Sequence, residues 1–202
     1  GANRACERRL TRPRELDGAR QCRYRDTSGD DKPAVIIRVQ SGESADTLDD
    51  RRMAKKRGCR ILSIVNVVGS TIANESDDVL YTWAGPEIAV ASTKAYSTQL
   101  AVIYMIALYM ADQLGTVPEA DMTRYMADLQ RLPDLAEAAL ADKATIQYFA
   151  SRYFHAHDLY FIGRNVDYAA SPEASSTLNE LTYIHSAPHT ACHLTHGPTS
   201  RL

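Results

Sequence analysis

Five consecutive residues, Gln40 to Ser44, combine two hydroxyl groups, an amide and a glycine in the sequence QSGES. They stand between an apolar run and a stretch with the composition of a helix. The first N–H groups of a helix have no partner within it and carry partial positive charge, so such a turn can hold an anion. Ser41 and Ser44 can add hydroxyl donors. The same residues also fit an ordinary strand–helix turn in which Ser44 is the helix N-cap.

A second group of ionisable side chains lies near the end of the sequence. Glu180 by itself is typical of an exposed helix residue. Four histidines follow it: His185, His189, His193 and His196. Spacings of four residues can place imidazoles on one helix face, where they could bind a metal. Because Pro188 would break such a helix, we expect no metal site here and a structural role for His185.

The composition is that of an ordinary globular protein. The sequence has 202 residues, 45% of them hydrophobic and 24% charged, which fits one domain or parts of two. A formal net charge of -2 gives no argument for binding nucleic acid or an acidic membrane. The longest apolar run, residues 100–111, is too short to span a bilayer. Four scattered cysteines without C-x-x-C spacing indicate reduced thiols and a cytoplasmic protein.

Short apolar runs alternate with helical stretches in the first half of the sequence. The predicted strands are residues 34–39, 60–66 and 78–82, and the predicted helices are residues 44–57, 70–76 and 92–114. Gly58 and Gly115 are expected to end the first and last of these helices, and Ser70 to cap the short one. The alternation predicts a parallel α/β sheet with helices on both faces. The polar turns that follow its strands would then meet at one edge, where such sheets bind ligands.

The second half is mainly helical. Residues 119–142 predict one or two amphipathic helices interrupted at Pro133, which would connect two units. A helix at 145–154, a strand at 158–163 and a helix at 169–183 follow. We therefore expect a first domain at 33–142, including the connector, and the start of a truncated second domain at 143–202 with no returning strand. Residues 1–32 are arginine-rich without a clear apolar period, and they predict a poorly ordered leader rather than a nucleic-acid-binding arm.

Six stretches of the sequence resemble one family in order and spacing. They are QSGESADT (40–47), IVNVVGSTIANESD (64–77), YTWAGPEIAVASTKAYSTQLA (81–101), YFIGRNVDYA (160–169), NELTYIH (179–185) and HLTHGP (193–198). Together they resemble the isomerase half of the glutamine–fructose-6-phosphate aminotransferases, which form glucosamine 6-phosphate. The resemblance implies two SIS domains, each an α/β/α sandwich with a parallel sheet. It also implies a homodimer, a glutaminase domain in the same full-length enzyme, and no cofactor or metal.

The resemblance assigns sugar-phosphate contacts to the first half of the sequence. Gln40, Ser41 and Ser44 match the loop that holds the 6-phosphate of the sugar. Val90 and Ser92 match the segment that contacts the sugar itself. Because the phosphate is remote from the reacting carbons, its binding energy would position the substrate.

The resemblance assigns the catalytic groups to the second half. Glu180 matches the acid/base glutamate that moves a proton between C1 and C2, a role that suits a carboxylate in a dry pocket. His196 matches the histidine that opens the sugar ring and acts across the dimer, and histidine can take and give a proton near neutral pH.

The sequence also departs from the family pattern. Thr177 stands where the family has a lysine, and Val39 stands where it has a serine that binds phosphate. The lysine that forms a Schiff base lies in the C-terminal tail of the family, whereas the sequence ends at Leu202. Without both lysines the amine chemistry would be missing. Two hypotheses therefore stay open: the isomerase and amino-transfer part of the enzyme, or a non-catalytic phosphosugar-binding module or inactive fragment.

Overall fold

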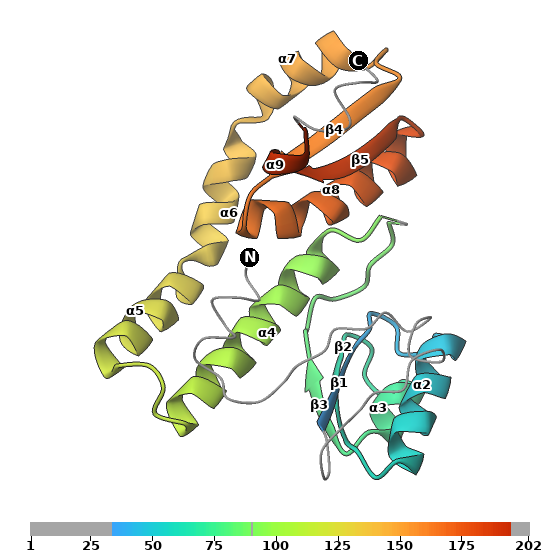
Figure 1. Ribbon diagram of the computed structural model, residues 1–202, viewed down its shortest axis with the longest axis vertical. Coiled ribbons are helices and arrows are strands. Elements are labelled where there is room, and N and C mark those ends of the chain that lie inside the picture. Colours follow the sequence, from blue (N-terminus) through green and yellow to red (C-terminus); the bar gives the residue numbers. More distant parts are fainter. Residues whose placement is uncertain (1–33, 90, 195–202) are drawn as a thin grey trace. The chain divides into compact units, whose positions relative to one another are not determined.

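The computed structural model describes residues 34–89 and 91–194, and these divide into two compact units between Leu114 and Gly115 (Figure 1). We call residues 34–114 the N-terminal unit and residues 115–194 the C-terminal unit, and each is described by itself. The predicted leader at 1–32 lies outside the described residues. The predicted domain boundary at 142/143 remains a prediction.

The N-terminal unit alternates strands and helices, as the sequence predicts. Its elements are β1 (Ala34–Arg38), α2 (Ala45–Lys56), β2 (Arg60–Val65), α3 (Thr71–Glu75), β3 (Asp78–Tyr81) and α4 (Lys94–Gln113). The strands form a parallel sheet in the order β1-β2-β3, with Val35 opposite Ile61 and Leu62 opposite Asp78. Gly58 and Gly115 follow the C-caps of α2 and α4 with positive φ, which confirms both predicted helix ends.

The core of this unit lies between the sheet and the helices α2 and α3. Successive side chains of a strand point to opposite faces, so alternate residues of β1 and β2 face these helices. The buried cluster consists of Ile37, Cys59, Ile61, Val65, Ile72 and Ala73. Removing a side chain such as Ile61 from water stabilises the fold by about 1.5–3 kcal/mol. This packing fixes the carboxyl ends of the strands, where the polar turns begin.

The other face of the sheet meets α4. The side chain of Arg38 points to the opposite face of the sheet from that of Ile37. Its guanidinium donates a hydrogen bond of 2.7 Å to Oε1 of Gln99 on α4. Gln99 is buried. Helices therefore contact both faces, as predicted, although Ile36 on the α4 side of β1 remains exposed.

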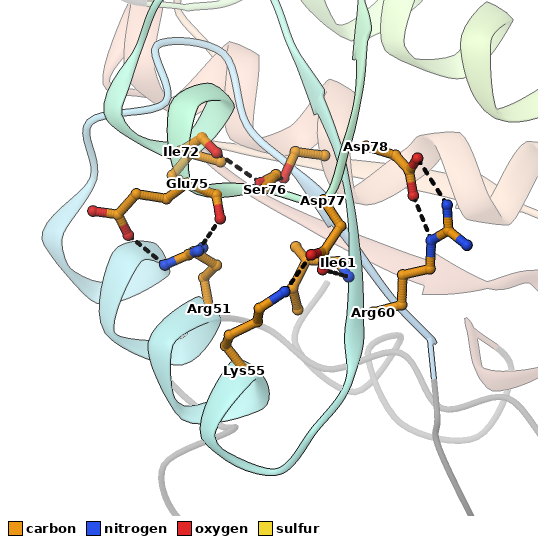
Figure 2. A network of polar contacts seen from close by, with 10 residues as sticks. Arg51, Lys55, Arg60, Ile61, Ile72, Glu75, Ser76, Asp77 and Asp78 are labelled. Atoms are coloured by element: carbon orange, nitrogen blue, oxygen red, sulfur yellow. Dashed lines mark hydrogen bonds and ion pairs between the residues drawn. The ribbon is translucent and has the colours of Figure 1, made fainter.

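Charged pairs join α2 to the end of α3 and to the turn before β3 (Figure 2). The buried guanidinium of Arg51 donates to the carboxylate and the backbone carbonyl of Glu75, at the end of α3. The ammonium of Lys55 pairs with Asp77, whose other oxygen accepts the N–H of Ile61 at 2.9 Å. These contacts hold α2 and the α3–β3 turn against the start of β2.

These hydrogen bonds change the acidity of the carboxyl groups. Donation from the Lys55 ammonium, and then from the Ile61 N–H, holds the pKa of Asp77 below its ordinary value of 3.8. Asp78 accepts two hydrogen bonds from Arg60, at 2.7 and 3.1 Å, and its pKa is lowered as well. Both carboxylates therefore favour the folded state only while they are ionised.

The C-terminal unit consists of five helices and two strands within the described residues. They are α5 (Glu119–Gln130), α6 (Leu132–Ala141), α7 (Lys143–Tyr153), β4 (Asp158–Gly163), α8 (Val166–Thr182), β5 (His185–Thr190) and α9 (Ala191–Leu194). The interruption predicted at Pro133 is confirmed, because this proline lies in the first turn of α6. The α8 helix packs against both strands and begins three residues before the predicted start at 169.

The prediction that no strand returns after α8 is wrong. Residues His185–Thr190 form β5, which pairs in parallel with β4, with Pro188 opposite Phe161. The sequence HSAPHT lacks a run of β-branched residues and contains a proline, which disfavours a central strand. Because β5 is bonded on only one side within the described sheet, the missing N–H of Pro188 can be accommodated there.

None of the helices within the described ranges combines the length and the apolar character that crossing a membrane requires.

Candidate functional site

The loop from Gln40 to Ser44 connects β1 to α2, as predicted. Ser44 is the N-cap residue of α2, with φ -67° and ψ 120°, and its carbonyl accepts the N–H of Leu48 at 3.0 Å. Its hydroxyl makes no capping hydrogen bond to the helix. The hydroxyl and the first N–H groups of α2 thus stand together at one helix end, where the macrodipole favours an anion. The ordinary-turn interpretation is confirmed for the backbone, whereas the anion site remains a prediction.

Two side chains of this loop differ in their hydrogen bonding. The Oγ of Ser41 accepts the N–H of Glu43 at 3.4 Å, and Ser41 is exposed. The Oε1 of Gln40 is buried and has no hydrogen-bond partner among the described residues. A buried acceptor without a partner is costly unless a further group satisfies it. Gln40 is therefore the residue of this loop with the clearest unused bonding capacity.

Asn66 connects the three turns at the carboxyl edge of the sheet. Its backbone N–H donates to the carbonyl of Gln40 at 3.1 Å. Its side-chain oxygen accepts the hydroxyl of Thr82 at 3.0 Å and the N–H of Ala84 at 2.9 Å, and its amide donates to the carbonyl of Gly85 at 2.7 Å. The prediction that these turns meet at one edge is confirmed.

The segment that leads into α4 places Ser92. Ala91 and Ala95, on either side of it, are buried, and Ser92 itself is half-buried. The carboxylate of Glu87 accepts the N–H of Ala95 at 3.2 Å and so caps the start of α4. Val90, the other predicted sugar contact, lies outside the described residues.

Glu180 lies on α8 in the C-terminal unit and is exposed. Its Oε1 accepts the hydroxyl of Ser176 at 3.2 Å. Thr177, which stands in the position of the family's lysine, is half-buried on the same helix. His196, the predicted ring-opening residue, lies outside the described residues.

A polar network fixes α8 against β5 beside Glu180. The Oδ1 of Asn179 accepts the backbone N–H of Ser186 at 2.8 Å and its hydroxyl at 2.9 Å. The hydroxyl of Ser186 also lies 2.8 Å from the hydroxyl of Ser175, and both serines are buried. Hydrogen bonds between buried polar groups are costly to break, so this network fixes the orientation of α8 about its own axis.

His185 and His189 lie on the strand β5, whereas His193 lies on the short helix α9. Nδ1 of His185 is 2.7 Å from Oδ1 of Asp158, across the first residue pair of β4 and β5. The ring of His189 packs 5.4 Å from that of Tyr160. Within the described part of the chain, no three metal-ligating side chains cluster.

Comparison with known proteins extends these observations. The SIS domain family matches residues 10–109. The chain is 46% identical over 185 residues to the glutamine–fructose-6-phosphate aminotransferase of Caldanaerobacter subterraneus. The matched region covers 92% of this chain and 30% of that protein. It is 46% identical over 190 residues to the Clostridium tetani enzyme of the same name, and this match covers 94% of the chain and 31% of that enzyme. The chain belongs to the SIS-domain family.

The solved structures agree with this assignment. The C-terminal domain of glucosamine–fructose-6-phosphate aminotransferase from Francisella tularensis superposes with a TM-score of 0.87 at 33% identity, over 91% of this chain and 52% of that one. The SIS-type α/β fold predicted from the sequence is thereby confirmed. The chain spans about a third of the length of the curated relatives it matches.

Some contacts that position the loops at the carboxyl edge of the sheet are not evident from the sequence. The sequence predicts Asn66 as the last residue of the strand at 60–66, where the polar turn begins, although an Asn at the end of a buried strand often bonds nearby backbone. Glu43 and Thr71 contact each other across 28 residues of sequence, and no local pattern indicates this contact.

Proposed function

We propose that the chain is the sugar-phosphate isomerase part of a glutamine–fructose-6-phosphate aminotransferase, acting in the conversion of fructose 6-phosphate to glucosamine 6-phosphate. The observation that carries this proposal is 46% identity over 92% of the chain to a protein of that name. The loop geometry supports it, because an anion site at the start of α2 suits the phosphate of such a sugar.

In this proposal the N-terminal unit binds the substrate. Gln40, Ser41 and Ser44 hold the 6-phosphate with amide and hydroxyl groups, beside the N–H groups that open α2. Val90 and Ser92 contact the sugar. The dianionic phosphate gains from the helix dipole, and its binding energy orients carbons that lie several bonds away.

The C-terminal unit supplies the proton chemistry. His196 assists ring opening, which yields the open-chain ketose. The carboxylate of Glu180 then takes a proton from C1 while the C2 carbonyl oxygen gains one, which gives an enediol. Return of the proton to C2, with loss of the O1 proton, gives the aldose. Thr177 offers a hydroxyl where a lysine would stabilise the developing negative charge, so we expect slow isomerisation.

The wider setting is part of the same proposal. Residues from 143 onward are the start of a second SIS domain. The full-length protein carries a glutaminase domain, works as a homodimer in the cytoplasm, and needs neither nucleic acid nor a membrane.

The second candidate function is a phosphosugar-binding SIS module without catalysis, which Thr177 favours. Solvent exchange separates the two functions. Incubation with fructose 6-phosphate in deuterium oxide should place deuterium at C1, as followed by proton NMR, and Glu180→Gln should abolish the exchange. Thr177→Lys should raise the rate by about tenfold or more, since one preorganised charge is worth at least that factor. Binding without any exchange would support the non-catalytic module, and exchange that survives in Glu180→Gln would overturn the assigned role of Glu180.

A further inference from the structure

Glu43 lies within the proposed phosphate loop, yet its side chain is bonded to a different helix. One carboxylate oxygen accepts the backbone N–H of Thr71 at 2.7 Å, and the other accepts the Thr71 hydroxyl at 2.8 Å. Thr71 is the first residue of α3, whose N-cap, Ser70, makes no side-chain capping bond. Glu43 therefore performs the capping of α3 from outside that helix.

The backbone of the loop is joined to the same turn of α3. The carbonyl of Gly42 accepts the N–H of Ile72 at 3.1 Å. Gly42 has φ +76°, and a Cβ placed on it would stand 2.7 Å from Cβ of Ser70, so the loop backbone at residue 42 lies directly against the side chain of Ser70. Three hydrogen bonds and one close packing contact thus fix two consecutive loop residues to α3.

The charge of Glu43 also bears on the neighbouring anion site. Donation from the Thr71 N–H, and then from the Thr71 hydroxyl, holds the pKa of Glu43 below its ordinary value of 4.5. The carboxylate therefore stays ionised at neutral pH and stays bonded to α3. A negative charge that turned toward a bound phosphate would oppose binding, and the contact with Thr71 directs it elsewhere.

We propose that Glu43 and Thr71 are positioning residues of the phosphate loop. By fixing the loop to α3, they preorganise the donors at 41 to 45 and keep the Glu43 carboxylate away from the phosphate. This inference rests on the proposed function, since it assigns a purpose to the loop that binds the sugar phosphate. Preorganisation raises affinity because the bound conformation no longer has to be selected from many.

Variants at the two positions test this pairing. Glu43→Ala removes both hydrogen bonds, Thr71→Val removes only the hydroxyl, and Thr71→Ser keeps both donors and is the conservative control. Calorimetric titration of the whole chain with glucosamine 6-phosphate should give a Kd about tenfold or more higher for Glu43→Ala, the size expected for a charge-assisted hydrogen-bond pair. Thr71→Ser should bind like the unsubstituted chain, and Thr71→Val should lie between the two.

The double variant distinguishes positioning from direct contact. If Glu43 acts through Thr71, the double variant Glu43→Ala/Thr71→Val should bind no more weakly than Glu43→Ala alone, because the pair shares one interaction. Additive losses would show that Glu43 contacts the sugar directly and would overturn the proposal. Unchanged affinity in Glu43→Ala would also overturn it while leaving the proposed function intact. An unsubstituted chain that does not bind glucosamine 6-phosphate would instead refute the proposed function, and this inference with it.

Discussion

The contact between Gly42 and Ser70 makes a compensating pair of substitutions possible. Gly42→Ala places a methyl group where the backbone of the loop approaches Ser70. Ser70→Gly removes the side-chain atoms that this methyl would meet, and the next nearest atom is then Cβ of Ile72 at 3.7 Å, an ordinary contact. We therefore expect the second substitution to rescue much of the damage caused by the first.

The expected energies follow from two separate effects. An L-residue in the left-handed region costs about 1–2 kcal/mol, and this strain remains in the double variant. Overpacking against Ser70 adds about 1–3 kcal/mol, which Ser70→Gly removes. Ser70→Gly alone should lose only a few tenths of a kcal/mol, about the difference between Ser and Gly at an N-cap. Its hydroxyl is buried without a partner in the described part of the chain, so no such hydrogen bond is lost.

Urea unfolding of the whole chain gives the free energies. Trp83 is the one tryptophan of the sequence and lies in the N-terminal unit, with its ring 5.8 Å from that of Tyr81. Its fluorescence therefore follows the unit that carries the substitutions. Gly42→Ala with Ser70→Ala serves as a control, because alanine keeps the Cβ of residue 70 and should rescue less than glycine does.

The outcome that would refute this reasoning is additivity. In that outcome, the free energy of unfolding of the double variant Gly42→Ala/Ser70→Gly falls by the sum of the decreases in the two single variants. The methyl then does not meet Ser70, and the described approach of loop and helix is wrong. A loss below about 0.5 kcal/mol for Gly42→Ala alone would show that the left-handed conformation is absent as well.

Three further substitutions probe other contacts. Because the pKa of Asp77 is lowered, its stabilising contribution is present above the ordinary value of 3.8 and is lost as pH falls through the lower folded value. Between about pH 5 and pH 2, the stability of Asp77→Asn should therefore fall less with decreasing pH than that of the unsubstituted chain. Urea midpoints that fall equally steeply in both proteins would contradict this. Asn66→Ala should destabilise the N-terminal unit by about 1–3 kcal/mol and weaken sugar-phosphate binding, measured by Trp83 fluorescence and calorimetry. Unchanged stability and binding would refute the role of Asn66 in connecting the three turns. Asn179→Ala should destabilise the C-terminal unit by about 1–3 kcal/mol in a circular dichroism melt and slow any C1 exchange, and an unaltered melt would count against the α8–β5 network.

Local chemistry made much of the fold predictable. The β-branched runs at β1 and β2 have few alternatives to a buried strand, and Gly58 and Gly115 supply the positive φ that ends a helix. Pro133 likewise marked the start of α6. These features act through the residue itself or its immediate neighbours, so the sequence alone indicates them.

Contacts between distant residues were not predictable in the same way. The strand β5 was missed because its residues gain their ladder only by pairing with β4. The Glu43–Thr71 contact depends on how α3 returns to the β1–α2 loop, and the bonds of Asn66 depend on where the segment after β3 lies. For the site, the sequence and its family resemblance predicted the loop and its helix, but not the residues that fix their geometry.

The central claim is that a sugar phosphate binds at the loop from Gln40 to Ser44, and amide chemical shifts test it most directly. Nitrogen-15-labelled chain would be titrated with glucosamine 6-phosphate, and with unphosphorylated glucosamine as the matched control. We predict saturable shifts at the amides of residues 41–45 with the phosphorylated sugar, and none there with glucosamine. Shifts confined to other residues, or equal shifts with both sugars, would contradict the claim.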